Sequence, residues 1–256
     1  MTTGVATVEG AQLAYRVDGE GPDLVLVHAG VADLRMWDPL VALLADRFRI
    51  VRYDMRGFGQ STSGPGAYSP SGDLSGLLGT LGVERPVLVG ASFGGLVALE
   101  FAATQPQRIA GLVVLDAPLP GHEWSERFRA FVAAEDAALE AGEIAELVRL
   151  NVELWAGEAG PAVQALVADM QEQAFRIQLA VETEAIELDP PVSERLAAVD
   201  MPVTVAYGER DVEDFIVMAE RLASELPAAT LHRIAGAGHL PALERPDAVA
   251  ELILGA

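Results

Sequence analysis

Ser92 lies in the segment Gly90-Ala91-Ser92-Phe93-Gly94, where residue types and spacing point most directly to chemistry. An apolar run precedes this segment and an Ala-rich apolar stretch follows it, which predicts a buried strand, a sharp turn and a helix. Glycines two residues before and two residues after the serine suit a turn in which strand and helix approach closely. Such a turn exposes the serine hydroxyl beside a helix N-terminus, where it can act as a nucleophile.

Two other interpretations of this segment are an ordinary strand-to-helix turn and a glycine-rich phosphate loop. All 17 basic residues are arginine, so the lysine of a Walker-type phosphate loop is absent. Schiff-base chemistry is excluded for the same reason. The absence of cysteine excludes thiol nucleophiles, disulfides and thiolate metal sites. The 4 histidines form no i, i+4 pair, and we expect neither a metal nor a cofactor.

A serine nucleophile needs a base, and the base needs a carboxylate that orients it. Asp211 follows an expected strand at 202–207, and His239 follows an expected strand at 229–234 within a glycine-rich turn. The carboxyl ends of parallel strands gather at one edge of a sheet, where ligands bind. The chain order Ser92, Asp211, His239 therefore predicts a catalytic triad.

Asp116 also ends an expected strand and is an alternative acid. Three further carboxyl residues crowd the loop of Asp211, namely Glu209, Glu213 and Asp214. Asp211 is preferred because it has both the expected chain order and the expected position at a strand end.

Ester cleavage also needs N–H donors for the oxyanion of the tetrahedral intermediate. We expect one from the backbone of Phe93, directly after the nucleophile, and one from Gly30 in the loop after the strand that ends at His28. His28 itself is interpreted as a hydrogen-bonding residue that stabilises this loop, since buried imidazoles usually hold a backbone partner.

Short apolar segments alternate with helical ones along most of the chain, which predicts an α/β fold with a doubly wound, mostly parallel sheet. Residues 4–17 are typical of an antiparallel hairpin, and further strands are expected at 24–28, 50–54, 87–91 and 109–116. Helices are expected at 37–46, 72–82, 213–226 and 244–254, with another following Ser92.

Residues 121–190 break this alternation. The segment is rich in Glu, Ala and Leu, with helical periodicity and interruptions at Gly142 and at 157–161. We predict an insertion of three or four helices without a strand, which divides the chain into a core domain (1–120 and 191–256) and a helical cap, or lid. Trp124, Trp155 and Phe175 are the candidate substrate contacts, although most cap aromatics are expected to form the core of the insertion.

The net charge of −21 disfavours nucleic acid as a partner, because phosphate would be repelled. No apolar run approaches the roughly 18 residues that span a bilayer, so we expect no membrane association. The first ten residues lack a basic region and an apolar core, which makes a cytoplasmic location the expectation. The expected partner is a small molecule, and a homodimer is left open.

Taken together, these motifs resemble α/β-hydrolase-fold serine hydrolases along nearly the full chain. The resemblance covers the loop from His28 to Trp37, the segment Asp54-Met-Arg-Gly-Phe-Gly-Gln-Ser61, the serine turn and the two triad loops. It implies an eight-stranded sheet with one antiparallel strand and a helical cap between strands six and seven. Small carboxylesterases, enol-lactonases and non-haem haloperoxidase-like esterases are the most similar branches. Ala29 departs from the family pattern, which has glycine after the histidine.

The function predicted is hydrolysis of a carboxylic ester or lactone of a small to medium, mainly apolar substrate through an acyl-enzyme. Carbon–carbon bond hydrolysis or a lyase reaction could use the same triad, and a ligand-binding sensor on the same fold is a third hypothesis. Four cap arginines could instead recognise a substrate carboxylate, although paired, solvated positions are expected for them: Arg127, Arg129, Arg149 and Arg176.

Overall fold

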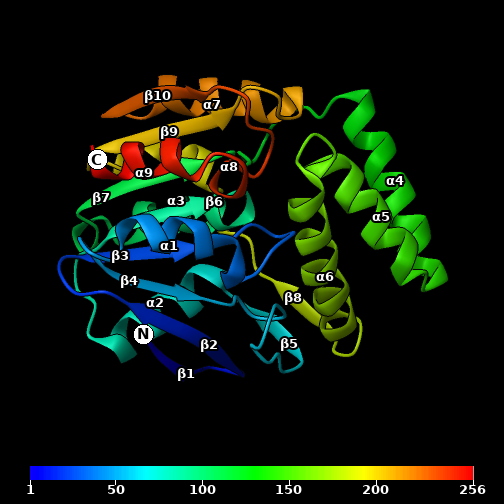
Figure 1. Ribbon diagram of the computed structural model, residues 1–256, viewed down its shortest axis with the longest axis horizontal. Coiled ribbons are helices and arrows are strands. Elements are labelled where there is room, and N and C mark those ends of the chain that lie inside the picture. Colours follow the sequence, from blue (N-terminus) through cyan, green and yellow to red (C-terminus); the bar gives the residue numbers. More distant parts are fainter. Residues whose placement is uncertain (256) are drawn as a thin grey trace.

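An eight-stranded sheet forms the centre of the protein, in a computed structural model that describes residues 1–255 (Figure 1). The strand order is β1-β2-β4-β3-β6-β7-β9-β10. These strands are β1 (Thr2–Val8), β2 (Ala11–Asp18), β3 (Asp23–Val27), β4 (Arg49–Tyr53), β6 (Val87–Ala91), β7 (Gly111–Leu115), β9 (Val203–Gly208) and β10 (Ala229–Ile234). Only β2 runs antiparallel to its neighbours, and the remaining pairs are parallel. The eight strands with a single antiparallel member confirm the predicted α/β architecture.

Helices pack on both faces of the sheet (Figure 1). α1 packs against α9, α2 packs against α3, and α7 packs against the last two strands. The bounds are α1 (Asp38–Leu44), α2 (Pro70–Leu81), α3 (Phe93–Thr104), α7 (Glu213–Glu225), α8 (Pro241–Glu244) and α9 (Pro246–Leu254). Short 3₁₀ helices are η1 (Leu34–Trp37), η2 (Pro106–Arg108), η3 (Val192–Glu194) and η4 (Leu196–Ala198).

The central strands are buried on both faces. Every residue of β7 and β9 is buried, whereas β10 at the sheet edge is largely exposed. Burial on both sides explains why the central strands are almost continuously apolar rather than alternating.

Between β7 and β9 the chain forms α4 (Glu126–Ala141), α5 (Ile144–Ala156) and α6 (Pro161–Gln178), which lie beyond the carboxyl ends of the strands (Figure 1). We call residues 121–190 the cap segment. Gly142 ends α4 in the left-handed conformation, with φ of 69°, and Pro161 occupies the first turn of α6. Glycine adopts positive φ without strain. Proline is tolerated in the first turn of a helix, because its missing N–H would have no acceptor within the helix there.

The prediction that residues 121–190 contain no strand was wrong. β8 (Thr183–Ala185) pairs in parallel with β5 (Gly66–Tyr68), which lies between β4 and α2, where no strand was expected. Both strands are three residues long and lack a buried position. Their pairing joins segments far apart in sequence, so no local sequence pattern predicts it.

No helix within residues 1–255 combines the length and the apolar composition that a membrane crossing requires.

Candidate active site

Ser92 lies between β6 and α3 in a backbone conformation that few non-glycine residues adopt. Its φ is 50° and its ψ is −121°. Within residues 1–255 only Ser92 and Asp116 are non-glycine residues with positive φ. Strained backbone of this kind persists where the surrounding structure enforces it, and it is concentrated at functional sites.

The glycines around Ser92 allow the strand and the helix to meet. A Cβ on Gly90 would lie 2.3 Å from the carbonyl oxygen of Gly94, and a Cβ on Gly94 would lie 2.4 Å from the carbonyl oxygens of Val27 and His28. A methyl group fits at neither position without backbone movement. These contacts show that α3 is pressed against the ends of β3 and β6, which turns the serine outward.

Ser92, His239 and Asp211 form a continuous hydrogen-bonded chain. His239 Nε2 lies 2.9 Å from Ser92 Oγ, and His239 Nδ1 lies 2.9 Å from both carboxylate oxygens of Asp211. Because an ionised carboxylate only accepts hydrogen bonds, Nδ1 carries the proton and Nε2 is free to accept the serine proton. This arrangement is the one that activates a serine hydroxyl.

Two aromatic rings hold the imidazole of His239. Trp155 of α5 lies over it with ring centroids 4.3 Å apart, and Phe215 of α7 meets it edge-on at 4.6 Å. The Trp155 indole donates to Asn151 Oδ1 at 3.1 Å, and Asn151 in turn donates to Glu135 at 2.6 Å. The orientation of His239 is therefore set by the cap segment as well as by Asp211.

The backbone N–H groups of Phe93 and Gly30 are the predicted oxyanion donors, and the two residues lie close together. Within residues 1–255, neither Phe93 nor Gly30 donates its backbone N–H to another protein group. A Cβ on Gly30 would lie 3.4 Å from the Cβ of Phe93, so the two loops are in contact. Free donors next to a nucleophile can hold a developing oxyanion.

The loop that carries Gly30 is fixed from several directions. Gln171 of α6 donates its amide to the Gly30 carbonyl at 3.2 Å, and Ala29 donates its backbone N–H to the sulfur of Met36 at 3.3 Å. Ala29 is fully buried, so the methyl group that departs from the family pattern packs into the core.

His28 holds this loop through both ring nitrogens. Its Nε2 accepts the backbone N–H of Met55 at 2.9 Å, so its Nδ1 carries a proton and donates to the Ala29 carbonyl at 2.8 Å. Burial lowers the pKa of His28 to about 4. The ring is neutral at physiological pH, and its contacts match the loop-stabilising interpretation.

Asp116, the alternative acid, lies directly beside the triad without bonding His239. Its Oδ1 accepts the backbone N–H of Gly208 at 2.8 Å, and its Oδ2 has no hydrogen-bond partner. Burial raises the pKa of Asp116 well above its ordinary value, and the adjacent Asp211 carboxylate raises it further. One carboxylate oxygen of Asp116, one of Asp211 and one ring nitrogen of His239 all lie within 4.8 Å of one another. The expectation that the site holds neither metal nor cofactor stays a prediction.

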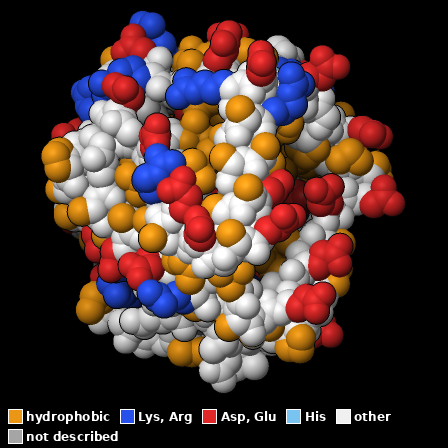
Figure 2. All heavy atoms as spheres, turned by 90° about the vertical axis from the view of Figure 1, so that its right-hand side faces the viewer, with side chains coloured by type: hydrophobic (Ala, Val, Ile, Leu, Met, Phe, Trp, Pro, Cys, Tyr) orange, Lys and Arg blue, Asp and Glu red, His pale blue; other side chains and the backbone are white. Residues whose placement is uncertain are grey.

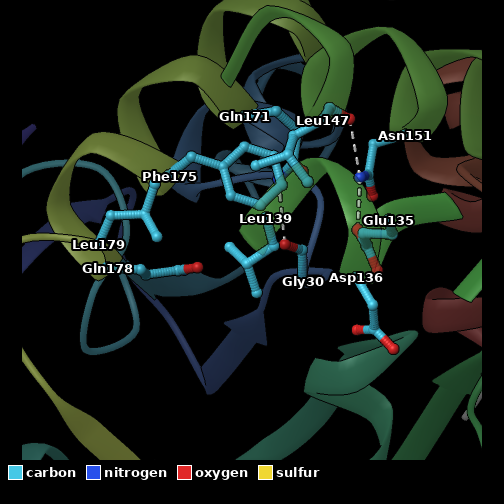
Figure 3. A pocket seen from close by; sticks show the side chains of 10 residues that line it. All are labelled: Gly30, Glu135, Asp136, Leu139, Leu147, Asn151, Gln171, Phe175, Gln178 and Leu179. Atoms are coloured by element: carbon cyan, nitrogen blue, oxygen red, sulfur yellow. Dashed lines mark hydrogen bonds between the residues drawn. The ribbon is translucent and has the colours of Figure 1, made fainter. Parts of the chain in front are cut away.

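A cavity of about 400 Å³ opens beside Gly30, between α4, α5 and α6 (Figure 3). Its apolar wall comes from Leu139, Leu147, Phe175 and Leu179. Its polar wall comes from Glu135, Asp136, Asn151, Gln171 and Gln178. A volume of this size is typical of pockets for small organic ligands.

The charges lining the cavity are acidic. Glu135 and Asp136 of α4 contribute them, and no arginine lines the cavity. In Figure 2, which looks onto the cap side, acidic side chains border a hollow in the surface. Of the four cap arginines, Arg149 is exposed and paired with Glu146 and Glu153, and Arg176 is exposed and paired with Glu172.

The three predicted substrate contacts occupy different surroundings. Phe175 lines the cavity. Trp155 is buried against His239, and Trp124 stacks on Phe128 with ring centroids 3.9 Å apart. Gln171 was missed by sequence reasoning, because a glutamine within a helix carries no signal of a distant backbone partner.

Comparison with known proteins places this geometry in context. A model of the alpha/beta hydrolase family matches residues 24–252. The chain is 28% identical to a pimeloyl-[acyl-carrier protein] methyl ester esterase from Pectobacterium atrosepticum, over 95% of this chain and 98% of that protein.

Two solved structures are similar over almost their whole length. An enol-lactonase from Burkholderia xenovorans is 26% identical with a TM-score of 0.82, covering 98% of each chain. A thermophilic esterase from Thermogutta terrifontis is 26% identical with a TM-score of 0.79, covering 100% of this chain and 97% of that one.

Proposed function

The chain belongs to the alpha/beta hydrolase family and is a hydrolase, and we propose that it cleaves a carboxylic ester or lactone with Ser92 as the nucleophile. The observation that carries this proposal is the hydrogen-bonded chain from Ser92 Oγ through His239 to Asp211. An esterase and an enol-lactonase among the similar structures support the same reaction class.

The reaction begins when Ser92 Oγ attacks the substrate carbonyl carbon while its proton passes to His239 Nε2. Asp211 stabilises the imidazolium that forms. The Phe93 and Gly30 N–H groups hold the oxyanion of the tetrahedral intermediate. His239 then gives its proton to the leaving alkoxide, which departs and leaves an acyl-enzyme. Water, deprotonated by His239, cleaves this acyl-enzyme and regenerates the serine.

The proposed substrate is uncharged and of small to medium size. The cavity volume of about 400 Å³ and its leucine and phenylalanine wall suit an apolar acyl or alcohol group. Glu135 and Asp136 would repel a substrate carboxylate, whereas an ester or a lactone without charge meets no such cost. Recognition of a carboxylate by the cap arginines has no support in this lining.

A Ser92→Ala variant tests the nucleophile. With p-nitrophenyl esters of increasing chain length, and with lactones beside them, we expect kcat to fall by about 10⁴-fold or more. The wild type is expected to be labelled by a fluorophosphonate probe and the variant not to be labelled. Ser224→Ala, at an exposed position of α7, is the matched control and keeps full activity. Near-normal esterase activity of the folded Ser92→Ala protein would contradict the proposal.

The charge preference is tested with a neutral methyl ester and the half-ester of a dicarboxylic acid. The wild type is expected to prefer the neutral ester. The double variant Glu135→Gln/Asp136→Asn should raise kcat/KM for the anionic half-ester about tenfold and leave the neutral ester nearly unchanged. A wild type that prefers the half-ester would refute the proposed substrate class.

A further inference from the structure

We propose that Asp116 is a positioning residue that keeps its carboxyl proton and donates it to Asp211, so that the two carboxyl groups share one negative charge beside His239. The inference goes beyond the proposed function, on which it rests for its activity readout. It gives a role to a side chain that the triad mechanism does not use.

The first support is the geometry of the two side chains. Asp116 ends β7 and Asp211 follows β9, its neighbour in the sheet. Both side chains are buried, and a carboxylate oxygen of Asp116 lies within 4.8 Å of a carboxylate oxygen of Asp211. Two ionised carboxylates at this separation, away from water, repel each other strongly, so one of them keeps a proton.

The hydrogen bonds decide which of the two keeps it. Asp211 bonds His239 through both oxygens and also accepts the backbone N–H of Val212 at 2.6 Å. Asp116 accepts only the backbone N–H of Gly208, and its Oδ2 is left without a donor. An unprotonated Oδ2 would be a buried charge without a partner, whereas a protonated one can donate to Asp211.

The backbone adds a second, independent observation. Asp116 has a φ of 49°, and among the non-glycine residues of 1–255 only Ser92 also has a positive φ. A non-glycine residue in this region of φ is strained, and the conformation persists only where the surrounding structure holds it. Its backbone N–H donates to the Ala206 carbonyl at 2.9 Å, so the strand ladder continues to the strained residue itself. The conformation turns the side chain toward Asp211.

The other charged groups around the pair do not remove the need for a proton. His239 faces Asp211 from the loop after β10, and Glu244 of α8 adds further negative potential at Asp116. Arg210 lies 4.0 Å from Glu244, in an exposed position. Burial raises the pKa of Asp116 well above its usual value. A neutral Asp116 adds no second buried negative charge beside Asp211 and Glu244, which fits these surroundings.

The consequence for catalysis concerns Asp211. A donor on Asp116 holds the Asp211 carboxylate in the plane that His239 needs, and it limits the charge facing the imidazolium to a single unit. Loss of this donor leaves Asp211 less well oriented, so kcat should suffer more than KM.

The experiment compares Asp116→Asn with Asp116→Ala in pH profiles of kcat/KM for a p-nitrophenyl ester. The amide of the asparagine is neutral, can accept the Gly208 N–H and can donate to Asp211. We therefore expect Asp116→Asn to leave the acid limb of the profile in place, with activity near that of the wild type. Asp116→Ala should lower kcat about tenfold, with little change in KM.

If Asp116 were ionised, Asp116→Asn would remove a negative charge close to His239. The acid limb would then move to lower pH by about 1 to 3 units, and this result would overturn the proposal. Loss of wild-type activity on dialysis against a chelator would also overturn it, because a cation would then hold the two carboxylates together.

A measurement without turnover separates this inference from the proposed function. Infrared difference spectra between the Ser92→Ala protein and the Ser92→Ala/Asp116→Asn protein at neutral pH should show the carbonyl band of a protonated carboxylic acid. The band is expected even if Ser92 is not the nucleophile, and it does not depend on Asp116→Ala folding. Its absence would refute the inference.

Discussion

Replacing Gly94 by alanine tests how closely α3 must approach the oxyanion loop. The new Cβ would lie 2.4 Å from the carbonyl oxygens of both Val27 and His28. These atoms belong to the backbone at the end of β3 and cannot rotate away. An ordinary contact needs about 3.4 Å, so α3 and the loop must separate by about 1 Å.

This displacement would act on catalysis and on stability by different amounts. Phe93 lies on α3 and Gly30 lies on the loop, so a separation of about 1 Å pulls the two oxyanion donors apart. A misplacement of about 1 Å at an active site can cost about 100-fold in rate. Overpacking a core typically costs about 1 to 3 kcal/mol. We therefore expect a folded Gly94→Ala protein whose kcat is about 100-fold below that of the wild type.

The assay measures kcat and KM for a p-nitrophenyl ester together with the urea unfolding of the same samples. Gly79→Ala is the matched control, because Gly79 lies in α2, is exposed, and has open space where its Cβ would be. That variant should keep full activity and gain up to about 1 kcal/mol of stability. Gly94→Ala with wild-type kcat would refute the argument that close approach of α3 sets the oxyanion donors.

Two further predictions concern the oxyanion loop. Gln171→Leu removes the amide that bonds the Gly30 carbonyl, so steady-state kinetics should show kcat about tenfold lower at similar KM; an unchanged kcat would mean that the loop is held without it. The unfolding free energy should fall as the pH drops below about 6.5, because His28 stays neutral when folded, with a pKa of about 4, but binds a proton when unfolded. The loss is about 2 kcal/mol at pH 5, and urea titrations of wild type and His28→Asn should show a shallower pH dependence in the variant.

Most of the fold was predictable because its signals are local. Buried parallel strands read as short apolar runs, and the helices between them have a clear apolar period. The hairpin of β1 and β2, the turn at Ser92 and the helix breaks at Gly142 and Pro161 all carry local turn chemistry. The pair formed by β5 and β8 has no such local signal. Both strands have three residues and no buried position, so they form by pairing with each other and their own composition does not predict them.

The candidate site was predictable to the level of residue types and chain order. The sequence alone pointed to Ser92, to His239 and to a carboxylate at a strand end, because nucleophile, base and acid each follow a strand. For the acid it favoured Asp211, with Asp116 as the alternative. The structure separates them: Asp211 reaches His239 Nδ1 at 2.9 Å, while Asp116 faces Asp211 instead.

What the sequence determined by itself is the set of chemical groups and the local turns that expose them, since both follow from residue identity and short-range sterics. What only the tertiary structure decided is which groups meet. Trp155 packs on His239, Gln171 bonds the Gly30 carbonyl, and acidic rather than basic side chains line the cavity. Each of these contacts joins the cap segment to loops or helices distant in sequence, and its geometry follows from how those elements pack together, which no local pattern records.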